Sequence, residues 1–350
     1  MFLPKRLVFS GGGTRCLIYI SVLKRLEAAG MLRDTVEWWG TSAGSLIAAL
    51  LAITRSSSRL EEISKHIDFA KFRDVSLLNV VNFTSAWGID DGYAMVAEIE
   101  RVLELAAVGA STWTLANVSG LRIIVGDLNI YETVVCSAQN FPELRIADAL
   151  RASMSLPFFY RPFRCPTNSH IWIDGGLRAT FPWDCLPSDA ARREALGFSF
   201  ERPWIHGPST FTEYIFAMTH FDDPKRIHAQ KKEWPQHIIW FPSPPFPAWY
   251  MRLKADDFDL LETLGSQAFE AWTAATAVAA VAAVAPKRQS PSKTSQIPRL
   301  SEDPHTPSPA RPGHHTDGSS DTPQPYPSTS QAPSQDSPPH TRPSFRRWSL

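Results

Sequence analysis

Residues 36–52, with the sequence VEWWGTSAGSLIAALLA, constrain the fold more than any other stretch of the chain. The apolar run at the start predicts a buried strand, and the run at the end contains no helix breaker and many good helix formers. Between them stands G-x-S-x-G, which in a strand–turn–helix context predicts a nucleophile elbow with Ser42 at its tip. Gly40 and Gly44 would flank a turn that is too sharp for larger side chains. Without the strand and the helix, the same five residues would indicate only a loop.

Alternating strands and helices around this stretch predict an α/β fold, with a mostly parallel central sheet covered by helices. A strand is expected over residues 5–10, a helix over 16–29 and a strand over 36–39, followed by the helix of the elbow. The remaining expected strands lie at residues 121–128, 130–136, 171–173, 196–200 and 237–241, and the remaining expected helices at 56–70, 90–107, 146–153 and 258–285, the last with a break at Gly265.

The composition excludes several classes of protein. A formal net charge of +0 does not favour nucleic acid as a partner, and a hydrophobic content of 43% is enough for a sizeable core. The four cysteines lack disulfide or metal-ligand spacing and H-E-x-x-H is absent, so neither a metal nor another cofactor is expected. Because no signal peptide and no run of about 18 apolar residues is seen, a cytoplasmic location is expected.

From residue 286 the composition changes to Pro, Ser, Thr, Gln and His, and apolar residues nearly vanish. Such a segment buries too little apolar surface to offset the entropy cost of ordering. We therefore predict a folded domain over residues 1–285 and a disordered tail over residues 286–350. The tail holds Ser-Pro and Thr-Pro pairs, for example Thr306-Pro307, at which phosphorylation or a proline-recognising domain would recruit a partner protein.

The first predicted strand and helix are joined by a second motif, Gly11-Gly12-Gly13-Thr14-Arg15. Three glycines let the backbone approach a ligand and point successive N–H groups at one spot, which is typical of an oxyanion hole. The alternatives are a phosphate loop, whose glycine patterns are absent, and a plain flexible turn. A cation at a helix start is unfavourable, so Arg15 is expected either to orient the loop or to meet an anionic substrate.

A nucleophilic serine needs a base within hydrogen-bond reach. Asp174-Gly175-Gly176 follows a short predicted strand, so the carboxylate is placed to reach a site at the rim of the sheet, although D-G-G is also a plain turn. Three histidines follow Asp174 in the chain order that α/β-hydrolases use for a Ser-His-Asp triad: His220, His228 and His237. From the residues alone, aspartate and histidine both remain candidates for the base.

Together the three motifs resemble those of the patatin-like phospholipases. Residues 147–163 are also similar to that family's segment before the catalytic aspartate, and residues 256–272 to its closing helix. The resemblance covers about residues 5–280 and implies a three-layer α/β fold. The motifs occur in the family's order: GGGTR at residues 11–15, GTSAG at 40–44 and DGG at 174–176.

The resemblance implies a Ser-Asp dyad without a catalytic histidine. Ser42 would attack an ester carbonyl while Asp174 accepts its proton, and water would then hydrolyse the acyl-enzyme. The oxyanion would be held by N–H groups of the glycine loop, chiefly those of Gly12 and Gly13 with Thr14. No metal is required in this family.

The family's substrates are fatty-acyl esters of phospholipids or neutral lipids. The resemblance therefore implies a phospholipase A-type enzyme that acts peripherally on membranes or lipid droplets. One departure is DGGLRATFP, which has Thr180 where the family usually has Asn, a change expected to loosen the orientation of Asp174. Two other functions stay open: acyl transfer through the same Ser42, and a weakly catalytic domain that acts as an interaction protein through its tail.

A lipid substrate also needs an apolar approach. Residues 234–250, WPQHIIWFPSPPFPAWY, combine six aromatic side chains with many prolines, which exclude a regular helix. One hypothesis is that these aromatic side chains, Phe246 and Trp249 among them, form a lid or an interfacial patch. The alternative is ordinary packing in the core.

Overall fold

The computed structural model describes residues 2–75, 77–201 and 223–284, together with the single residues 210, 214 and 217. The predicted tail over residues 286–350 lies outside the described residues, and so does His220. In the described part of the chain, no helix is both long enough and apolar enough to cross a bilayer.

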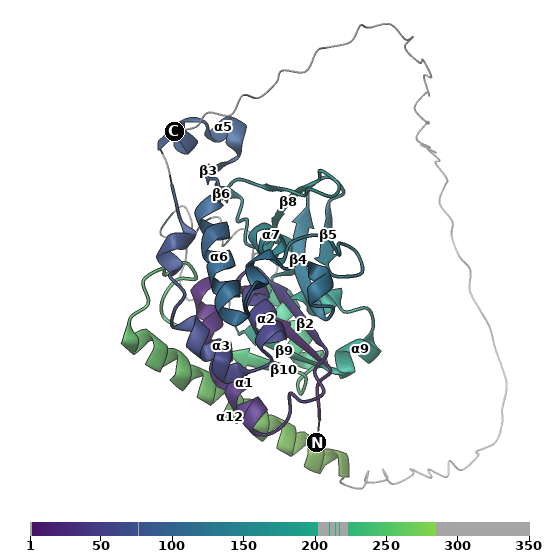
Figure 1. Cartoon of the computed structure of the whole chain (residues 1–350). Coiled ribbons are helices and arrows are strands. Elements are labelled where there is room, and N and C mark those ends of the chain that lie inside the picture. Colours follow the sequence, from purple (N-terminus) through teal and green to yellow (C-terminus); the bar gives the residue numbers. More distant parts are fainter. Residues whose placement is uncertain are drawn as a thin grey trace, which may run out of the picture. The chain divides into compact units, whose positions relative to one another are not determined.

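The central sheet has the strand order β10-β9-β1-β2-β4-β8-β7, and β5 also pairs with β4 (Figure 1). Five neighbouring strands are parallel, and they are β10 (Ile238–Phe241), β9 (Ala195–Phe200), β1 (Arg6–Phe9), β2 (Glu37–Thr41) and β4 (Leu121–Asp127). Antiparallel pairing at the β4 end involves β5 (Glu132–Cys136), β8 (Ile171–Asp174) and β7 (Phe163–Arg164). The predicted α/β class with a mostly parallel sheet is confirmed.

Side chains from both faces of the sheet are buried, as a three-layer arrangement requires. Leu7 and Phe9 belong to the larger apolar core and Val8 to the smaller one, which is the alternation expected of a strand covered on both faces. The larger core is filled by side chains of six helices: α1 (Ile18–Ala28), α2 (Ala43–Thr54), α3 (Ser57–Ser64), α6 (Tyr93–Ala106), α7 (Ile146–Ser153) and α12 (Ala255–Val284).

Most of the remaining elements are short. The helices are α4 (Leu77–Val81), α5 (Phe83–Ala86), α8 (Gly176–Ala179), α9 (Asp189–Arg193) and α11 (Asp223–Glu233), and the 3-10 turns are η1 (Gly13–Leu17), η2 (Phe69–Phe72), η3 (Ala110–Thr112), η4 (Leu115–Asn117) and η5 (Pro182–Cys185). A second sheet pairs β3 (Gly88–Asp90) with β6 (Phe158–Tyr160), and Figure 1 shows it beside α5.

Some boundary predictions were wrong. The helix expected over residues 56–70 ends at Ser64, and two further differences have identifiable reasons. The helix expected from residue 90 begins at Tyr93, because residues 88–90 form β3 instead. Gly265 does not break its helix, since α12 is continuous through it. A Cβ atom on Gly265 would lie 2.1 Å from the Ser21 Oγ atom of α1, so this glycine allows the two helices to pack closely.

The pairing of β4 brings two strand ends together. Both β2 and β5 pair with residues 123 and 124, so they lie on opposite edges of β4. Both β8 and β5 pair with residues 125–127, so β8 lies on the same edge as β2. On that shared edge β2 ends at Thr41 opposite Ile124, and β8 ends at Asp174 opposite Val125. The residues that follow β2 therefore meet the end of β8.

Candidate active site

Ser42 occupies the sharp turn between β2 and α2 that its motif predicts. Its backbone has φ 51° and ψ −132°, a conformation that is uncommon for a residue with a side chain and is stored at functional turns. The flanking glycines are required by close backbone contacts. A Cβ atom on Gly40 would lie 2.5 Å from the Gly44 carbonyl oxygen, and one on Gly44 would lie 2.4 Å from the Ser10 carbonyl oxygen.

A second serine holds this turn in place. The Ser42 N–H donates to Ser153 Oγ at 2.9 Å, and Ser153 Oγ donates to the Ile124 carbonyl oxygen at 2.6 Å. The turn is thereby fixed to the middle of β4. Sequence reasoning did not single out Ser153, although it lies within the segment 147–163 that resembles the family.

Asp174 accepts hydrogen bonds at both carboxylate oxygens. Ser42 Oγ donates to Oδ2 at 2.8 Å, and the Gly176 N–H donates to Oδ1 at 2.7 Å. The side chain is buried, and this burial raises the pKa of Asp174 from its ordinary value of 3.8 to about 7, while the two hydrogen bonds act in the opposite direction. A carboxyl group that titrates near neutrality is suited to exchanging a proton with the serine.

Two of the three histidines considered as bases lie away from Ser42. His237 Nδ1 is 3.3 Å from the Ala195 carbonyl oxygen, and His228 is exposed on α11. His220 lies outside the described residues. Among the residues that the structure describes, no histidine lines the cavity that holds Ser42 or is hydrogen-bonded to it. Asp174 is therefore the titratable partner that the described geometry gives to Ser42.

The glycine loop lies against the elbow. A Cβ atom on Gly11 would lie 3.2 Å from the Ser42 Cβ atom. Two of its N–H groups are already engaged, since Gly11 donates to the Thr180 carbonyl oxygen and Thr14 to the Ala248 carbonyl oxygen, both at 2.8 Å. In the described part of the chain, the N–H groups of Gly12 and Gly13 have no acceptor.

Arg15 supports the loop from behind. Its side chain is 4% exposed, and its Nε donates to the Gly12 carbonyl oxygen at 3.3 Å. Its guanidinium lies over the Phe200 ring, and burial lowers the pKa of Arg15. Because Arg15 does not line the cavity that holds Ser42, its position favours orientation of the loop over contact with a substrate.

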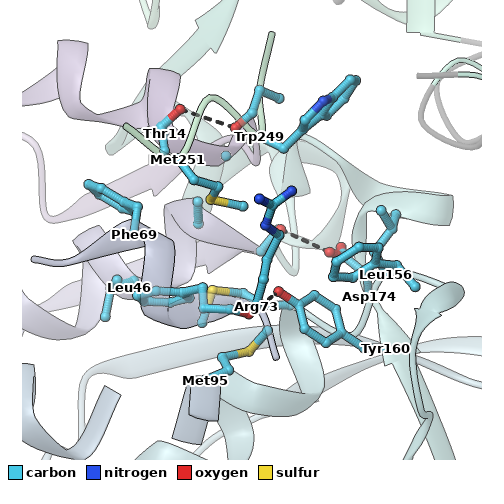
Figure 2. A pocket seen from close by; sticks show the side chains of 17 residues that line it. Thr14, Leu46, Phe69, Arg73, Met95, Leu156, Tyr160, Asp174, Trp249 and Met251 are labelled. Carbon is cyan, nitrogen blue, oxygen red and sulfur yellow. Dashed lines mark hydrogen bonds between the residues drawn. The ribbon is translucent and has the colours of Figure 1, made fainter. Parts of the chain in front are cut away.

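Ser42 and Asp174 open into a cavity of about 100 Å³ (Figure 2). Its walls are formed mainly by aliphatic, aromatic and methionine side chains. These belong to Leu46, Phe69, Phe72, Met95, Met154, Leu156, Phe159, Tyr160, Ala248, Trp249 and Met251. Arg73 supplies the cationic side chain of the lining, and its guanidinium has no acceptor among the described residues. Arg73 could not be selected from the sequence, because it belongs to no motif.

In the aromatic stretch over residues 234–250, some side chains pack in the core and others lie near the cavity. Trp234 and Phe241 are buried in the two cores, which is ordinary packing. Trp249 lines the cavity and Phe246 packs partly against the core.

The residues described in the structure include no group of three or more His, Cys, Asp or Glu side chains arranged to hold a metal ion.

A family model described as patatin-like phospholipase matches residues 7–186, which include all three motifs. The protein YqhO of Bacillus subtilis is 27% identical over 262 residues, which cover 67% of this chain and 86% of YqhO. Patatin-like phospholipase domain-containing protein 6 of Mus musculus is 31% identical over 188 residues, which cover 53% of this chain but 13% of that protein. The crystal structure of VipD from Legionella pneumophila matches 77% of this chain and 67% of VipD, with 13% identity and a TM-score of 0.48.

Proposed function

The chain belongs to the patatin-like phospholipase family, and we propose that it is a lipid acyl hydrolase of the phospholipase A type in which Ser42 is the nucleophile and Asp174 the general base. The observation that carries this proposal is the 2.8 Å hydrogen bond from Ser42 Oγ to Asp174 Oδ2 at the wall of an apolar cavity. A nucleophile and a base in direct contact form the minimal unit for covalent acyl transfer.

In the first half-reaction, the Asp174 carboxylate accepts the hydroxyl proton of Ser42 while Ser42 Oγ attacks the ester carbonyl carbon. The tetrahedral intermediate collapses, its alcohol leaves with the proton from Asp174, and the acyl group remains on Ser42. In the second half-reaction, Asp174 accepts a proton from water, and the resulting hydroxide attacks the acyl-enzyme. The fatty acid leaves as Ser42 regains its proton, so the enzyme is restored.

The negative oxygen of each intermediate needs donors that are free in the resting enzyme. The N–H groups of Gly12 and Gly13 meet this requirement, because Gly11 and Thr14 already donate to other carbonyl oxygens. Gly13 also lines the cavity beside Ser42. We therefore assign the oxyanion to Gly12 and Gly13, with Gly11, Thr14 and Arg15 holding the loop in shape.

The lining of the cavity favours a phospholipid over a neutral lipid. Apolar walls suit a fatty-acyl chain. The Arg73 guanidinium adds a cation without an internal partner, which suits a phosphate group better than the uncharged glycerol esters of a neutral lipid.

The decisive experiment is hydrolysis of defined phospholipids followed by mass spectrometry of the released fatty acids and lysolipids. Ser42→Ala and Asp174→Asn are expected to lower the rate at least about 10³-fold, and a fluorophosphonate probe is expected to label the wild type but not Ser42→Ala. His237→Ala serves as the matched control and is expected to keep full activity. Activity that survives in Ser42→Ala, or that disappears in His237→Ala with the fold intact, would overturn the dyad.

A further inference from the structure

The segment from Val75 to Tyr93 carries an unusual concentration of exposed apolar side chains. On α4, Leu77 is 81% exposed and Leu78 is 69% exposed, and they share a helix face with Val81. We call the whole set the α4–α5 surface; it consists of Val75, Leu77, Leu78, Val80, Val81, Trp87, Tyr93 and Phe158. Exposed apolar side chains that gather on neighbouring elements, here α4, α5, β3 and β6, mark an interaction site more often than single exposed side chains do.

This surface is attached to the wall of the proposed active site at both ends. Before α4, Phe72 and Arg73 line the cavity. After α5, β3 pairs with β6, whose residues Phe159 and Tyr160 line the same cavity. The Tyr160 hydroxyl also donates to the Phe72 carbonyl oxygen at 2.5 Å, so a hydrogen bond joins the two cavity-lining segments to each other. The segment that carries the exposed apolar side chains is thus connected at both ends to walls of the cavity that would take the acyl chain.

Cations flank the surface. A second hollow, of about 530 Å³, is lined by Trp87 together with Arg161 and Arg164. The Arg161 guanidinium has no acceptor among the described residues, and Arg164 donates to the Ser169 carbonyl oxygen at 2.9 Å.

Other charges in this hollow are already compensated. Arg145 is paired with Glu100 and Asp148, and the charge of Arg151 is opposed by the nearby carboxylates of Asp90 and Asp91. The carboxylate of Asp91 accepts from the Tyr93 N–H. Arg161 and Arg164 therefore leave an excess of positive charge beside the apolar side chains.

We propose that the α4–α5 surface docks the protein on an anionic lipid bilayer. Its apolar side chains would insert among the acyl chains, while Arg73, Arg161 and Arg164 would lie at the level of the headgroup phosphates. The choice of a bilayer as occupant rests on the proposed lipid hydrolase function, on the flanking cations and on the attachment of the surface to two walls of the cavity. Docking there would bring a phospholipid directly to the cavity of Ser42.

The test measures binding of the full chain, carrying Ser42→Ala so that no lipid is consumed, to vesicles of phosphatidylcholine with phosphatidylserine. The double variant Leu78→Asp/Val81→Asp is expected to lower the vesicle partition coefficient at least about tenfold. Val108→Asp is the matched control, because Val108 is 93% exposed but follows the far end of α6, about 20 Å along that helix from Tyr93. This control is expected to bind vesicles as the parent does.

A second pair of variants tests the cationic flank. Arg161→Gln and Arg164→Gln are each expected to lower binding to vesicles with phosphatidylserine by about fivefold, and to leave binding to pure phosphatidylcholine vesicles nearly unchanged. The effect is expected to fade at high salt.

Unchanged vesicle binding by Leu78→Asp/Val81→Asp would overturn the proposal. So would a wild-type dimer that this variant separates without loss of vesicle binding, since a second copy would then cover the surface. Turnover of a soluble ester, measured with Ser42 restored, separates this inference from the proposed function. Vesicle binding through α4 without any esterase activity would refute the hydrolase alone, and esterase activity without docking through α4 would refute the docking surface alone.

Discussion

The carbonyl oxygen of Thr180 accepts a hydrogen bond from the Gly11 N–H at 2.8 Å, which joins the turn after Asp174 directly to the glycine loop. Ser10 Oγ donates to the same oxygen at 3.2 Å. The Thr180 side chain closes its own turn, because Oγ1 donates to the Gly176 carbonyl oxygen at 2.8 Å. Thr180 thus connects the two halves of the proposed site mainly through its backbone. We therefore expect the site to tolerate threonine at a position where asparagine is usual in the family.

The first prediction concerns this hydroxyl. Thr180→Val removes one buried hydrogen bond but keeps the backbone link to Gly11, so the free energy of unfolding is expected to fall by about 1 kcal/mol. Turnover of a soluble ester should fall less than about tenfold, because the Gly176 N–H still holds Asp174. Urea unfolding and steady-state kinetics measure the two effects.

Thr54→Val is a matched control for Thr180→Val. Thr54 Oγ1 also donates to the carbonyl oxygen four residues earlier, that of Leu50, at 2.8 Å. The Thr54→Val variant should lose a similar free energy of unfolding, with no change in turnover. A loss of 10³-fold in Thr180→Val with the fold intact would show that the side chain itself orients Asp174, contrary to this prediction.

The elements of the proposed site were predictable because each motif is local. Gly40 and Gly44 flank a turn that only glycine permits, so the elbow around Ser42 can be recognised without its neighbours. The partner of Ser42 could not be derived in this way, because the contact with Asp174 depends on which edge of β4 each strand occupies. The residues alone left aspartate and histidine open, and the family resemblance supplied the aspartate.

The α4–α5 surface was not predicted for a different reason. Residues 77–86 form two helices of only five and four residues, which are too short to show a helical period. The hypothesis of an interfacial patch in residues 234–250 rests on the density of aromatic residues there. Much of that stretch packs in the core, since Trp234 and Phe241 are buried. Density of aromatic residues does not distinguish a core from an interface, whereas burial does.

The second prediction is the pH dependence of activity. Asp174 acts as a base only when it is ionised, and burial raises its pKa to about 7. For a soluble ester, kcat/KM is therefore expected to rise with pH, to reach half of its maximum near pH 7 and to level off above pH 8. A rate that is constant from pH 5 to pH 9, or that falls across this range, would contradict the assignment.

The third prediction follows from the same pKa. Activity is expected to rise with pH, whereas the free energy of unfolding is expected to fall. Between pH 4 and pH 7 the unfolded chain has released the Asp174 proton while the folded chain retains it, so stability falls as pH rises through this window. The difference between 3.8 and about 7 corresponds to about 4 kcal/mol as an upper bound. Asp174→Asn is therefore expected to be more stable than the wild type at pH 8, by about 2–4 kcal/mol in urea unfolding. The difference should shrink toward pH 4, and a less stable variant at pH 8 would contradict the burial argument.

The fourth prediction tests the oxyanion loop. Gly13 has φ +59°, and a Cβ atom there would lie 1.8 Å from the Ala248 carbonyl oxygen. Gly13→Ala must therefore displace the loop, and kcat is expected to fall at least about 10²-fold because an oxyanion donor is lost. Gly30→Ala is the control, since Gly30 has φ +69° with no atom near its Cβ position. That variant should lose about 1 kcal/mol of stability and keep its activity. Equal activity of the two variants would exclude the loop from catalysis.

The last prediction concerns Arg73 and the class of lipid. If its guanidinium binds the phosphate of a phospholipid, Arg73→Gln loses a charge-assisted hydrogen bond of about 1.5–3 kcal/mol. The expected result is a fall of about 10- to 100-fold in kcat/KM for a short-chain, micelle-free phosphatidylcholine, which separates substrate binding from membrane docking. An uncharged ester of the same acyl chain, such as its p-nitrophenyl ester, should be hydrolysed at nearly the wild-type rate, because it offers Arg73 no anion. Arg33→Gln, at an arginine whose side chain is 68% exposed and which does not line the cavity, controls for the loss of charge. An equal fall in kcat/KM for both esters would mean that Arg73 shapes the cavity rather than recognising phosphate. No fall for either ester would contradict phosphate recognition, and neutral lipids would again be candidate substrates.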